Sequence, residues 1–175
     1  MNLRERKINS KTIFDGKIVK LEVDGVELPD GSRAVRECVR HSGGAAVLLV
    51  HDNKVLLVKQ FRYLYGKEIY EIPAGKLNEG EDGAVAAERE LEEETGYRSR
   101  LVPLLDLYPS VGYTDEIIHI YYAESYKFVG QKLDEGEFLN CEFVALDKVL
   151  EMIDRGEICD AKTVAAIYKY VLKQK

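Results

Sequence analysis

The segment from Glu88 to Glu94 constrains this chain most, because five of its seven residues are glutamates. The apolar run Ala84–Ala87 leads into it, so the segment is expected to be helical. On a helix Glu90 faces Glu93 and Glu94, and like charges at these spacings cost about 0.2–0.5 kcal/mol per pair. The charges also crowd the C-terminal end, where the helix dipole disfavours anions. A bound cation would reverse each of these effects, so the sequence predicts a metal site.

The alternative for this segment is a solvated acidic helix face. Such a face normally carries Lys or Arg four residues from each acid, and Arg89 is the only base between Glu88 and Glu94. Carboxylate oxygens favour Mg²⁺, Mn²⁺ or Ca²⁺ over zinc or copper. No histidine lies in the run and the three cysteines are scattered, so a nitrogen–sulfur metal site is not expected.

The residues around the run follow a longer pattern, Gly-x5-Glu-x7-Arg-Glu-apolar-x-Glu-Glu-x-Gly-apolar. Its fixed positions are occupied by Gly75, Glu81, Arg89-Glu90-Leu91, Glu93-Glu94, Gly96 and Tyr97. The segment therefore resembles the signature of the Nudix hydrolases. The resemblance implies an α/β/α sandwich with a mixed sheet, and divalent-cation-dependent hydrolysis of a nucleoside diphosphate linked to another moiety.

The composition limits which partners and which cellular compartment are expected. With 175 residues, 46% of them hydrophobic, the chain can bury one full core. A net charge of −6 argues against nucleic acid as the main partner, but a bound cation would still admit a small phosphate ligand. The longest apolar run, Ala45–Val50, is too short to cross a bilayer. The sparse cysteines and the lack of a signal-peptide pattern predict a cytoplasmic protein without membrane contact.

Alternating and apolar runs predict strands, and capping residues predict two further helices. The expected strands are Lys17–Leu28, Arg33–His41, Ala45–Val50, Lys54–Arg62, Glu68–Ile72, Leu101–Tyr108, Ile117–Glu124 and Phe138–Ala145. Asp147 is expected to cap a helix that runs to about Arg155, and Asp160 to cap the last one. Mixed strands with helices indicate a layered α/β fold.

The chain is expected to divide into an N-terminal β-hairpin arm, residues 1–42, and a Nudix hydrolase domain, residues 43–175. The arm could instead be an edge of the main sheet. In the ADP-ribose pyrophosphatase branch of the family a similar strand region pairs with the partner subunit, so the resemblance implies a homodimer. Whether the arm swaps between subunits stays open.

Candidate metal ligands come from the helix and from the turn before it. Glu90 and Glu94 lie one helical turn apart and can converge on one cation. The resemblance makes both of them ligands, with Glu93 as a further or outer-shell carboxylate and Ala74 as a backbone carbonyl donor. Arg89 is expected to orient the glutamates through charge-assisted hydrogen bonds, and Gly96 is expected to be the C-cap of the helix. Mg²⁺ is the expected cofactor, with Mn²⁺ as an alternative.

Pyrophosphate hydrolysis also needs a base that deprotonates the attacking water. In the ADP-ribose pyrophosphatase branch this base lies in a downstream loop that precedes an apolar strand. The segment from Leu133 to Leu139 fits that description, and Glu137 matches the position of the base, with Glu135 as the reserve. The alternative for either residue is a solvated loop glutamate.

Further matches concern the substrate. Arg62 resembles the strand-end arginine that contacts the diphosphate, while Ser110 and Glu116 lie in a segment similar to a substrate-binding Ser-Pro-Gly loop. Val111 departs from that loop's proline, which marks ADP-ribose specificity. The expected reaction cleaves ADP-ribose, or a related nucleoside diphosphate sugar, to AMP and ribose 5-phosphate. GDP-mannose, a dinucleotide or an oxidised nucleotide are alternative substrates, and a catalytically silent nucleotide-binding module is the other alternative.

Overall fold

The computed structural model describes residues 2–174, which form two compact units. The arm unit comprises the residues up to Gly43 together with Tyr108–Ile117. The core unit comprises Gly44–Leu107 and the chain from Ile118 onward. Within residues 2–174 no helix is both long and apolar enough to cross a membrane.

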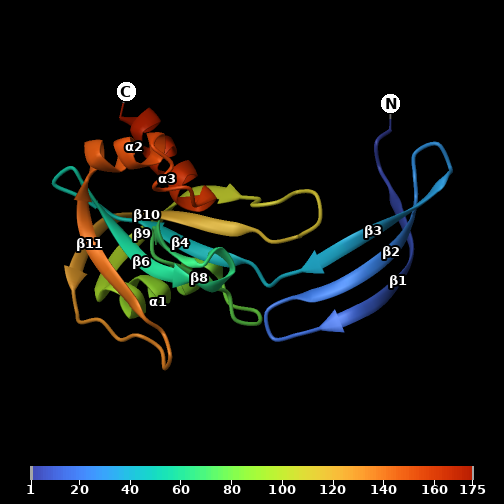
Figure 1. Cartoon of the computed structure of the whole chain (residues 1–175), viewed down its shortest axis with the longest axis horizontal. Helices are drawn as coiled ribbons and strands as arrows, with labels where there is room; N and C mark the ends of the chain where they lie inside the picture. Colours follow the sequence, from blue (N-terminus) through green and yellow to red (C-terminus); the bar gives the residue numbers. More distant parts are fainter. Residues whose placement is uncertain (1, 175) are drawn as a thin grey trace. The chain divides into compact units, whose positions relative to one another are not determined.

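The arm unit is built on an antiparallel sheet in the order β1 (Arg6–Asp15), β2 (Lys20–Glu27) and β3 (Arg33–Arg40) (Figure 1). The β2–β3 hairpin was expected from its sequence, and Leu28 N–H donates to Ser32 O at 2.8 Å to close the turn. Strand β1 was not expected. All of its residues are exposed, so it lacks the half-buried alternation by which a strand is recognised.

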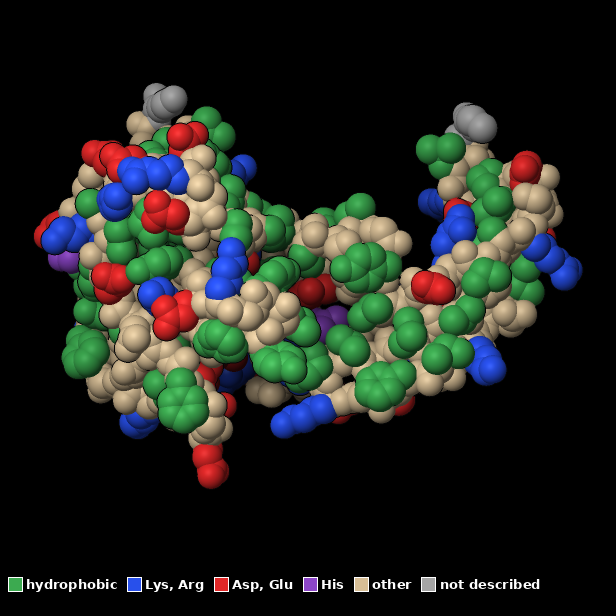
Figure 2. All heavy atoms as spheres, viewed as in Figure 1, with side chains coloured by type: hydrophobic (Ala, Val, Ile, Leu, Met, Phe, Trp, Pro, Cys, Tyr) green, Lys and Arg blue, Asp and Glu red, His purple; other side chains and the backbone are tan. Residues whose placement is uncertain are grey.

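Several large apolar side chains of the arm unit face solvent, and Figure 2 shows hydrophobic side chains gathered on its surface. They belong to β1, to the turn after it and to β3: Ile8, Ile13, Phe14, Ile18 and Val35. Exposed apolar side chains gathered on one unit are characteristic of an interaction surface.

The core unit contains two sheets. One has the order β8-β4-β10-β9, with β4 and β10 parallel and the other pairs antiparallel; the second has the order β11-β6-β5, with β7 paired to β6. The strands are β4 (Gly44–Leu48), β5 (Val50–His51), β6 (Lys54–Arg62), β7 (Lys67–Glu71), β8 (Ala74–Lys76), β9 (Tyr97–Leu107), β10 (Ile118–Phe128) and β11 (Leu139–Ala145). This mixed architecture confirms the expected fold class.

Strand β4 separates two hydrophobic cores because its side chains alternate between the faces of its sheet. Ala45 and Val47 pack in the cluster that contains Leu91 of helix α1 (Gly83–Thr95). Ala46 and Leu48 pack in the cluster that contains residues of α2 (Leu146–Asp154) and α3 (Ala161–Lys173). Helices therefore cover opposite sides of the strands, as Figure 1 shows for α1 against α2 and α3.

The ends of α1 follow from its capping residues. Asp82 accepts a hydrogen bond from Ala84 N–H at 2.8 Å and begins the helix. Gly96 ends it with φ 74°, and its N–H donates to Glu92 O at 2.9 Å. This left-handed conformation favours glycine, and the predicted role of Gly96 as C-cap is confirmed.

The caps of the later helices gave one correct and one wrong prediction. Asp160 caps α3 and accepts from Thr163 N–H at 3.0 Å, as expected. Asp147 does not cap α2: the N-cap position is Ala145, which makes no side-chain capping bond, and Asp147 lies in the first turn. There its charge still interacts favourably with the helix dipole.

Candidate active site

Helix α1 and strand β8 meet at the glutamates. Glu94 is only 3% exposed, and its Oε2 accepts a hydrogen bond from Ala74 N–H at 2.9 Å. Gly75 lies so close to Glu90 that a Cβ at this glycine would fall 2.0 Å from the Glu90 carboxyl carbon. Glycine at position 75 is therefore what allows the Glu90 carboxylate to pack against the backbone of β8.

Arg89 connects the carboxylates of this site. It binds Glu81 through Nε and Nη2, each at 3.0 Å, and its Nη1 lies 2.6 Å from Glu90 Oε1 and 3.1 Å from Glu93 Oε2. Arg89 Nη2 also donates to Lys76 O at 3.2 Å. The hydrogen bonds from Arg89 lower the pKa of Glu81 to about 2. One guanidinium thus holds the carboxylates of Glu81, Glu90 and Glu93 in fixed relative positions.

The carboxylates of α1 carry more negative charge than Arg89 balances. Burial raises the pKa of Glu94 to about 8, and the charges of Glu90 and Glu137 add to the shift. Burial likewise raises the pKa of Glu90, and the charges of Glu93 and Glu137 act in the same direction. Glu137 therefore lies within electrostatic reach of both proposed ligands. The arrangement favours a cation at this place.

The donor set fits a hard divalent cation. In the part of the chain that the structure describes, no three His, Cys, Asp or Glu side chains are already arranged as a metal cage. Arg89 Nη1 lies between Glu90 and Glu93, and Glu94 faces the backbone of Ala74. Carboxylate oxygens together with a backbone carbonyl are nevertheless the donors that Mg²⁺ and Mn²⁺ prefer.

A cavity of about 550 Å³ lies beside this face of α1. It is lined by Arg89, Glu92, Glu93, Lys132, Leu133 and Asp134. This volume is within the range of small-molecule sites, and two of the lining side chains are cationic. Residues 132–134 precede Glu137 in the same loop, so this loop runs next to the acidic helix.

The two candidates for the base differ in exposure. Glu137 is half-buried, and its N–H donates to Asp134 O at 3.0 Å. Glu135 is exposed. The charge of Glu137 also raises the pKa values of Glu90 and Glu94. Glu137 is therefore better placed than Glu135 to act beside these glutamates.

Arg62 ends β6 and binds the buried Glu71 at the end of β7. The distances are 2.5 Å from Nε to Oε1 and 2.8 Å from Nη2 to Oε2. Lys162 of α3 binds the same carboxylate. Neither Glu71 nor Lys162 was predicted from the sequence. The sign that could have identified Glu71 is its place between the apolar residues Tyr70 and Ile72.

Ser110 and Glu116 belong to the arm unit, where a loop carries them past β3. Val39 N–H donates to Tyr113 O at 2.7 Å, and Asp115 N–H donates to Val39 O at 3.2 Å. Glu116 N–H donates to Thr114 Oγ1 at 3.2 Å. Backbone pairing with β3 therefore sets the position of this loop.

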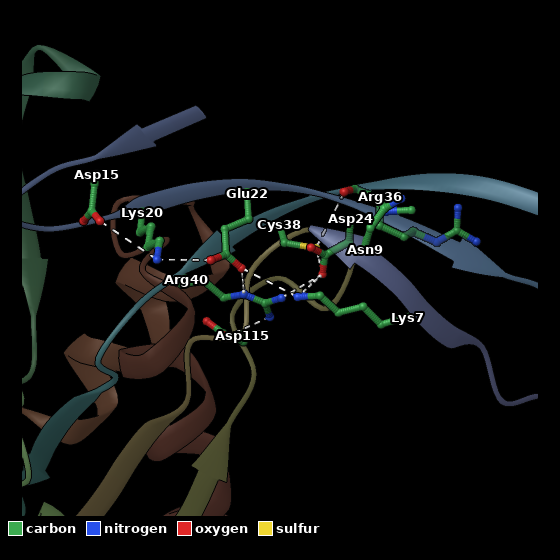
Figure 3. Close-up of polar contacts among 11 residues, drawn as sticks. Lys7, Asn9, Asp15, Lys20, Glu22, Asp24, Arg36, Cys38, Arg40 and Asp115 are labelled. Carbon is green, nitrogen blue, oxygen red and sulfur yellow. Dashed lines mark hydrogen bonds and ion pairs between the residues drawn. The ribbon is translucent and has the colours of Figure 1, made fainter. Parts of the chain in front are cut away.

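Asp115 adds a charged anchor to the same loop. It accepts from Arg40 Nη1 at 3.2 Å and from His41 N–H at 3.0 Å. Arg40 also binds Glu22 and Asp24, at 3.0 Å each, so the loop joins the polar network of the sheet (Figure 3). This anchor was not predicted from the sequence. It holds the loop that contains the exposed Val111, at which position a proline would have restricted the backbone instead.

The fold and the carboxylate site define a member of the Nudix family. Residues 40–167 match the model of the NUDIX domain, and residues 5–39 match that of the nucleoside diphosphate sugar hydrolase N-terminal domain. The chain belongs to the Nudix family and is a Nudix hydrolase.

Known relatives extend over almost the whole chain. The ADP-ribose pyrophosphatase of Bacillus subtilis (strain 168) is 44% identical over 177 residues, which cover 99% of this chain and 96% of the relative. The methanol dehydrogenase activator of Bacillus methanolicus is 45% identical over 174 residues, 97% of this chain and 94% of the relative. The crystal structure of an ADP compounds hydrolase shares the fold, with a TM-score of 0.84 at 22% identity, over 97% of this chain and 94% of that one.

Proposed function

We propose that this enzyme hydrolyses the pyrophosphate bond of ADP-ribose, or of a closely related nucleoside diphosphate sugar, to AMP and ribose 5-phosphate. The observation that carries the proposal is the buried carboxylate cluster of α1, with Glu94 held against Ala74 and Glu90 against Gly75. The similarity to an ADP-ribose pyrophosphatase over 99% of the chain supports the choice of substrate.

Glu90, Glu94 and the carbonyl of Ala74 would hold the cation, with Glu93 in support. Mg²⁺ is the proposed ion and Mn²⁺ the alternative. A divalent cation bound there would neutralise charge on phosphate oxygens and lower the pKa of bound water. Arg89 keeps Glu90 and Glu93 in place through its hydrogen bonds at 2.6 and 3.1 Å.

Glu137 is the proposed general base, which takes a proton from the attacking water. Its half-buried position beside the glutamates of α1 supports this role, and a positioned base contributes about 10²–10⁴-fold to a rate. Glu135 is the reserve candidate.

Arg62, Ser110 and Glu116 are the proposed substrate-binding residues. Arg62 would contact the diphosphate, since its side chain is 41% exposed although Glu71 holds it. Ser110 and Glu116 would bind from the loop that Asp115 anchors to β3. A guanidinium is well suited to this task because its planar donors match phosphate oxygens.

A substrate panel tests the proposal. Purified enzyme with Mg²⁺ or Mn²⁺ would be assayed on ADP-ribose, GDP-mannose, a dinucleotide and an oxidised nucleotide, with kcat/KM as the measure of discrimination. We expect ADP-ribose to give the highest value. A preference of tenfold or more for another compound would reassign the substrate, and binding without turnover on every compound would indicate a silent nucleotide-binding module.

We further propose that the enzyme is a homodimer in which the arm unit forms the contact. Phe14 and Val35 are 56% and 63% exposed, and burying them against a second copy would remove this apolar surface from water. Light scattering of the wild type and of the variant Val35→Asp tests this. We expect the mass of a dimer for the wild type and a lower average mass for Val35→Asp. A monomeric wild type would contradict the proposal.

We also place the enzyme in the cytoplasm. Cys38, Cys141 and Cys159 are all free thiols, which is the state that a reducing compartment maintains. Fractionation of the cells that produce the protein, followed by immunodetection, would locate it.

A further inference from the structure

A charged cluster with two buried members lies where β6, β7 and α3 meet. It consists of Arg62, Glu71, Asp160 and Lys162. Glu71 is 3% exposed and Lys162 is 8% exposed. Buried charges are retained at a considerable desolvation cost, and here they are fully paired. None of the roles proposed above explains Lys162.

Arg62 is held by one edge of its guanidinium only. Nε and Nη2 bind the two oxygens of Glu71 at 2.5 and 2.8 Å. Among residues 2–174, Nη1 has no hydrogen-bond partner, and the side chain is 41% exposed. The bidentate contact therefore fixes the plane of the guanidinium and leaves Nη1 free to donate to a ligand.

Lys162 binds the carboxylate that holds Arg62. Its Nζ donates to Glu71 Oε2 and lies 3.1 Å from Asp160 Oδ1. Burial pushes the pKa of Glu71 upward, but the hydrogen bond from Arg62 and the charge of Lys162 outweigh it, so the pKa is lowered and the carboxylate stays ionised. Asp160 is the second carboxylate of the cluster and lies beside Lys162, so the four charges balance, and Lys162 holds the Glu71 carboxylate in place against Arg62.

The first turn of α3 fixes Lys162 in this position. Asp160 Oδ2 accepts from Thr163 N–H at 3.0 Å and from Thr163 Oγ1 at 2.6 Å. Thr163 Oγ1 in turn accepts from Ile72 N–H at 2.8 Å, in the residue after Glu71. The capping turn thus holds Lys162 and the end of β7 in one rigid arrangement.

We propose that Lys162 is a positioning residue for the substrate: by sharing the Glu71 carboxylate with Arg62, it holds the group that orients the Arg62 guanidinium, so that Nη1 is available to a diphosphate group. Lys162 acts through Arg62 and does not itself touch the ligand. This inference rests on the proposed function of the site.

A double-mutant cycle tests the coupling. The wild type, Lys162→Met, Arg62→Ala and the double variant would be compared for kcat and KM on ADP-ribose with Mg²⁺. We expect Lys162→Met to raise KM about tenfold and to change kcat less than about threefold, as loss of uniform binding does. In the Arg62→Ala background the same substitution should change KM less than about twofold, because the residue through which it acts is gone.

Two further variants separate positioning from folding. Lys169→Met removes an exposed lysine of the same helix that makes no ion pair within residues 2–174, and it should leave KM unchanged. Lys162→Gln keeps a hydrogen-bond donor for Glu71 but removes the positive charge. If Lys162→Met unfolds below the assay temperature, Lys162→Gln takes its place in the cycle. An equal rise in KM in both backgrounds, or an unchanged KM, would overturn the inference.

Binding of inorganic pyrophosphate separates this inference from the proposed function. If the wild type releases no AMP from ADP-ribose, the proposed function fails, and calorimetric titration of the same proteins with pyrophosphate still tests Lys162. We expect about tenfold weaker binding for Lys162→Met only when Arg62 is present. Equal affinities, or no binding by the wild type, would contradict the role of Lys162.

Discussion

The backbone N–H of Ala74 donates to Oε2 of Glu94 at 2.9 Å, and this bond joins strand β8 to the acidic helix α1. This hydrogen bond favours the ionised form of Glu94, whose carboxylate is buried. Both residues are proposed to hold the same cation. The bond therefore places the two candidate ligands next to each other.

The stability of the cation-free protein should fall with rising pH. The pKa of Glu94 is raised from 4.5 to about 8, so between these values the folded state holds a proton that the unfolded state has released. The stabilisation is complete below pH 4.5 and is lost as the pH rises through 8, by up to about 1.4 kcal/mol per pH unit. Urea unfolding in EDTA at several pH values would measure it.

Glu94→Gln is the control for this pH dependence. Glutamine keeps an acceptor oxygen for Ala74 N–H but has no titrating proton. We expect most of the slope to disappear and the cation-free variant to be more stable than the wild type at pH 8. A slope that remains unchanged in this variant would assign the titration to another group.

Gly75→Ala should disturb the cation site and leave the fold in place. The added Cβ would lie 2.0 Å from the Glu90 carboxyl carbon, so that side chain has to move away from β8. Misplacing a reacting group by about 1 Å costs about 10²-fold in rate. We expect kcat/KM to fall by that order with an unchanged far-ultraviolet circular dichroism spectrum; full activity would show that Glu90 need not pack against β8.

Glu137→Gln should lower kcat by about 10²–10⁴-fold, because it removes the proposed base. KM should change little, since the substrate contacts remain. Glu135→Gln is the matched control from the same loop and should keep wild-type activity. If the control variant loses activity and Glu137→Gln does not, the base is Glu135.

Arg89→Met should destabilise the protein and weaken cation binding. The substitution leaves Glu81 and Glu90 without their cationic partner, and both are partly buried. Breaking such a pair costs about 3–5 kcal/mol when it is fully buried, so we expect about 1–3 kcal/mol here. Urea unfolding measures the loss, and Arg98→Met, which removes an exposed pair with Glu92, should cost below 1 kcal/mol.

The local elements of the core unit could be predicted from sequence because each carries a local signal. Strand β6 has the expected bounds, Lys54–Arg62. Its apolar run Val55–Val58 marks it in the sequence, and these residues are buried in the structure. The caps Asp160 and Gly96 were predicted because their backbone roles depend on residue type. Strand β1 was missed because its exposed face has no such pattern.

The contacts between distant segments could not be predicted from sequence. Lys162 meets Glu71 across 91 residues, and Asp115 meets Arg40 across 75. A lysine at the start of a helix, or an aspartate in a loop, gives no local sign of such a partner. The spacing within α1 is different, because helical periodicity alone brings Glu90 and Glu94 to one face.

Release of AMP from ADP-ribose tests the central claim most directly. Wild type with Mg²⁺, wild type with EDTA, and Glu94→Gln with Mg²⁺ would be compared by chromatography of the nucleotide products. The account predicts equal amounts of AMP and ribose 5-phosphate from the wild type with Mg²⁺, and a loss of at least about 10²-fold in the other two samples. Absence of AMP from the wild type, or undiminished activity of folded Glu94→Gln, would contradict it.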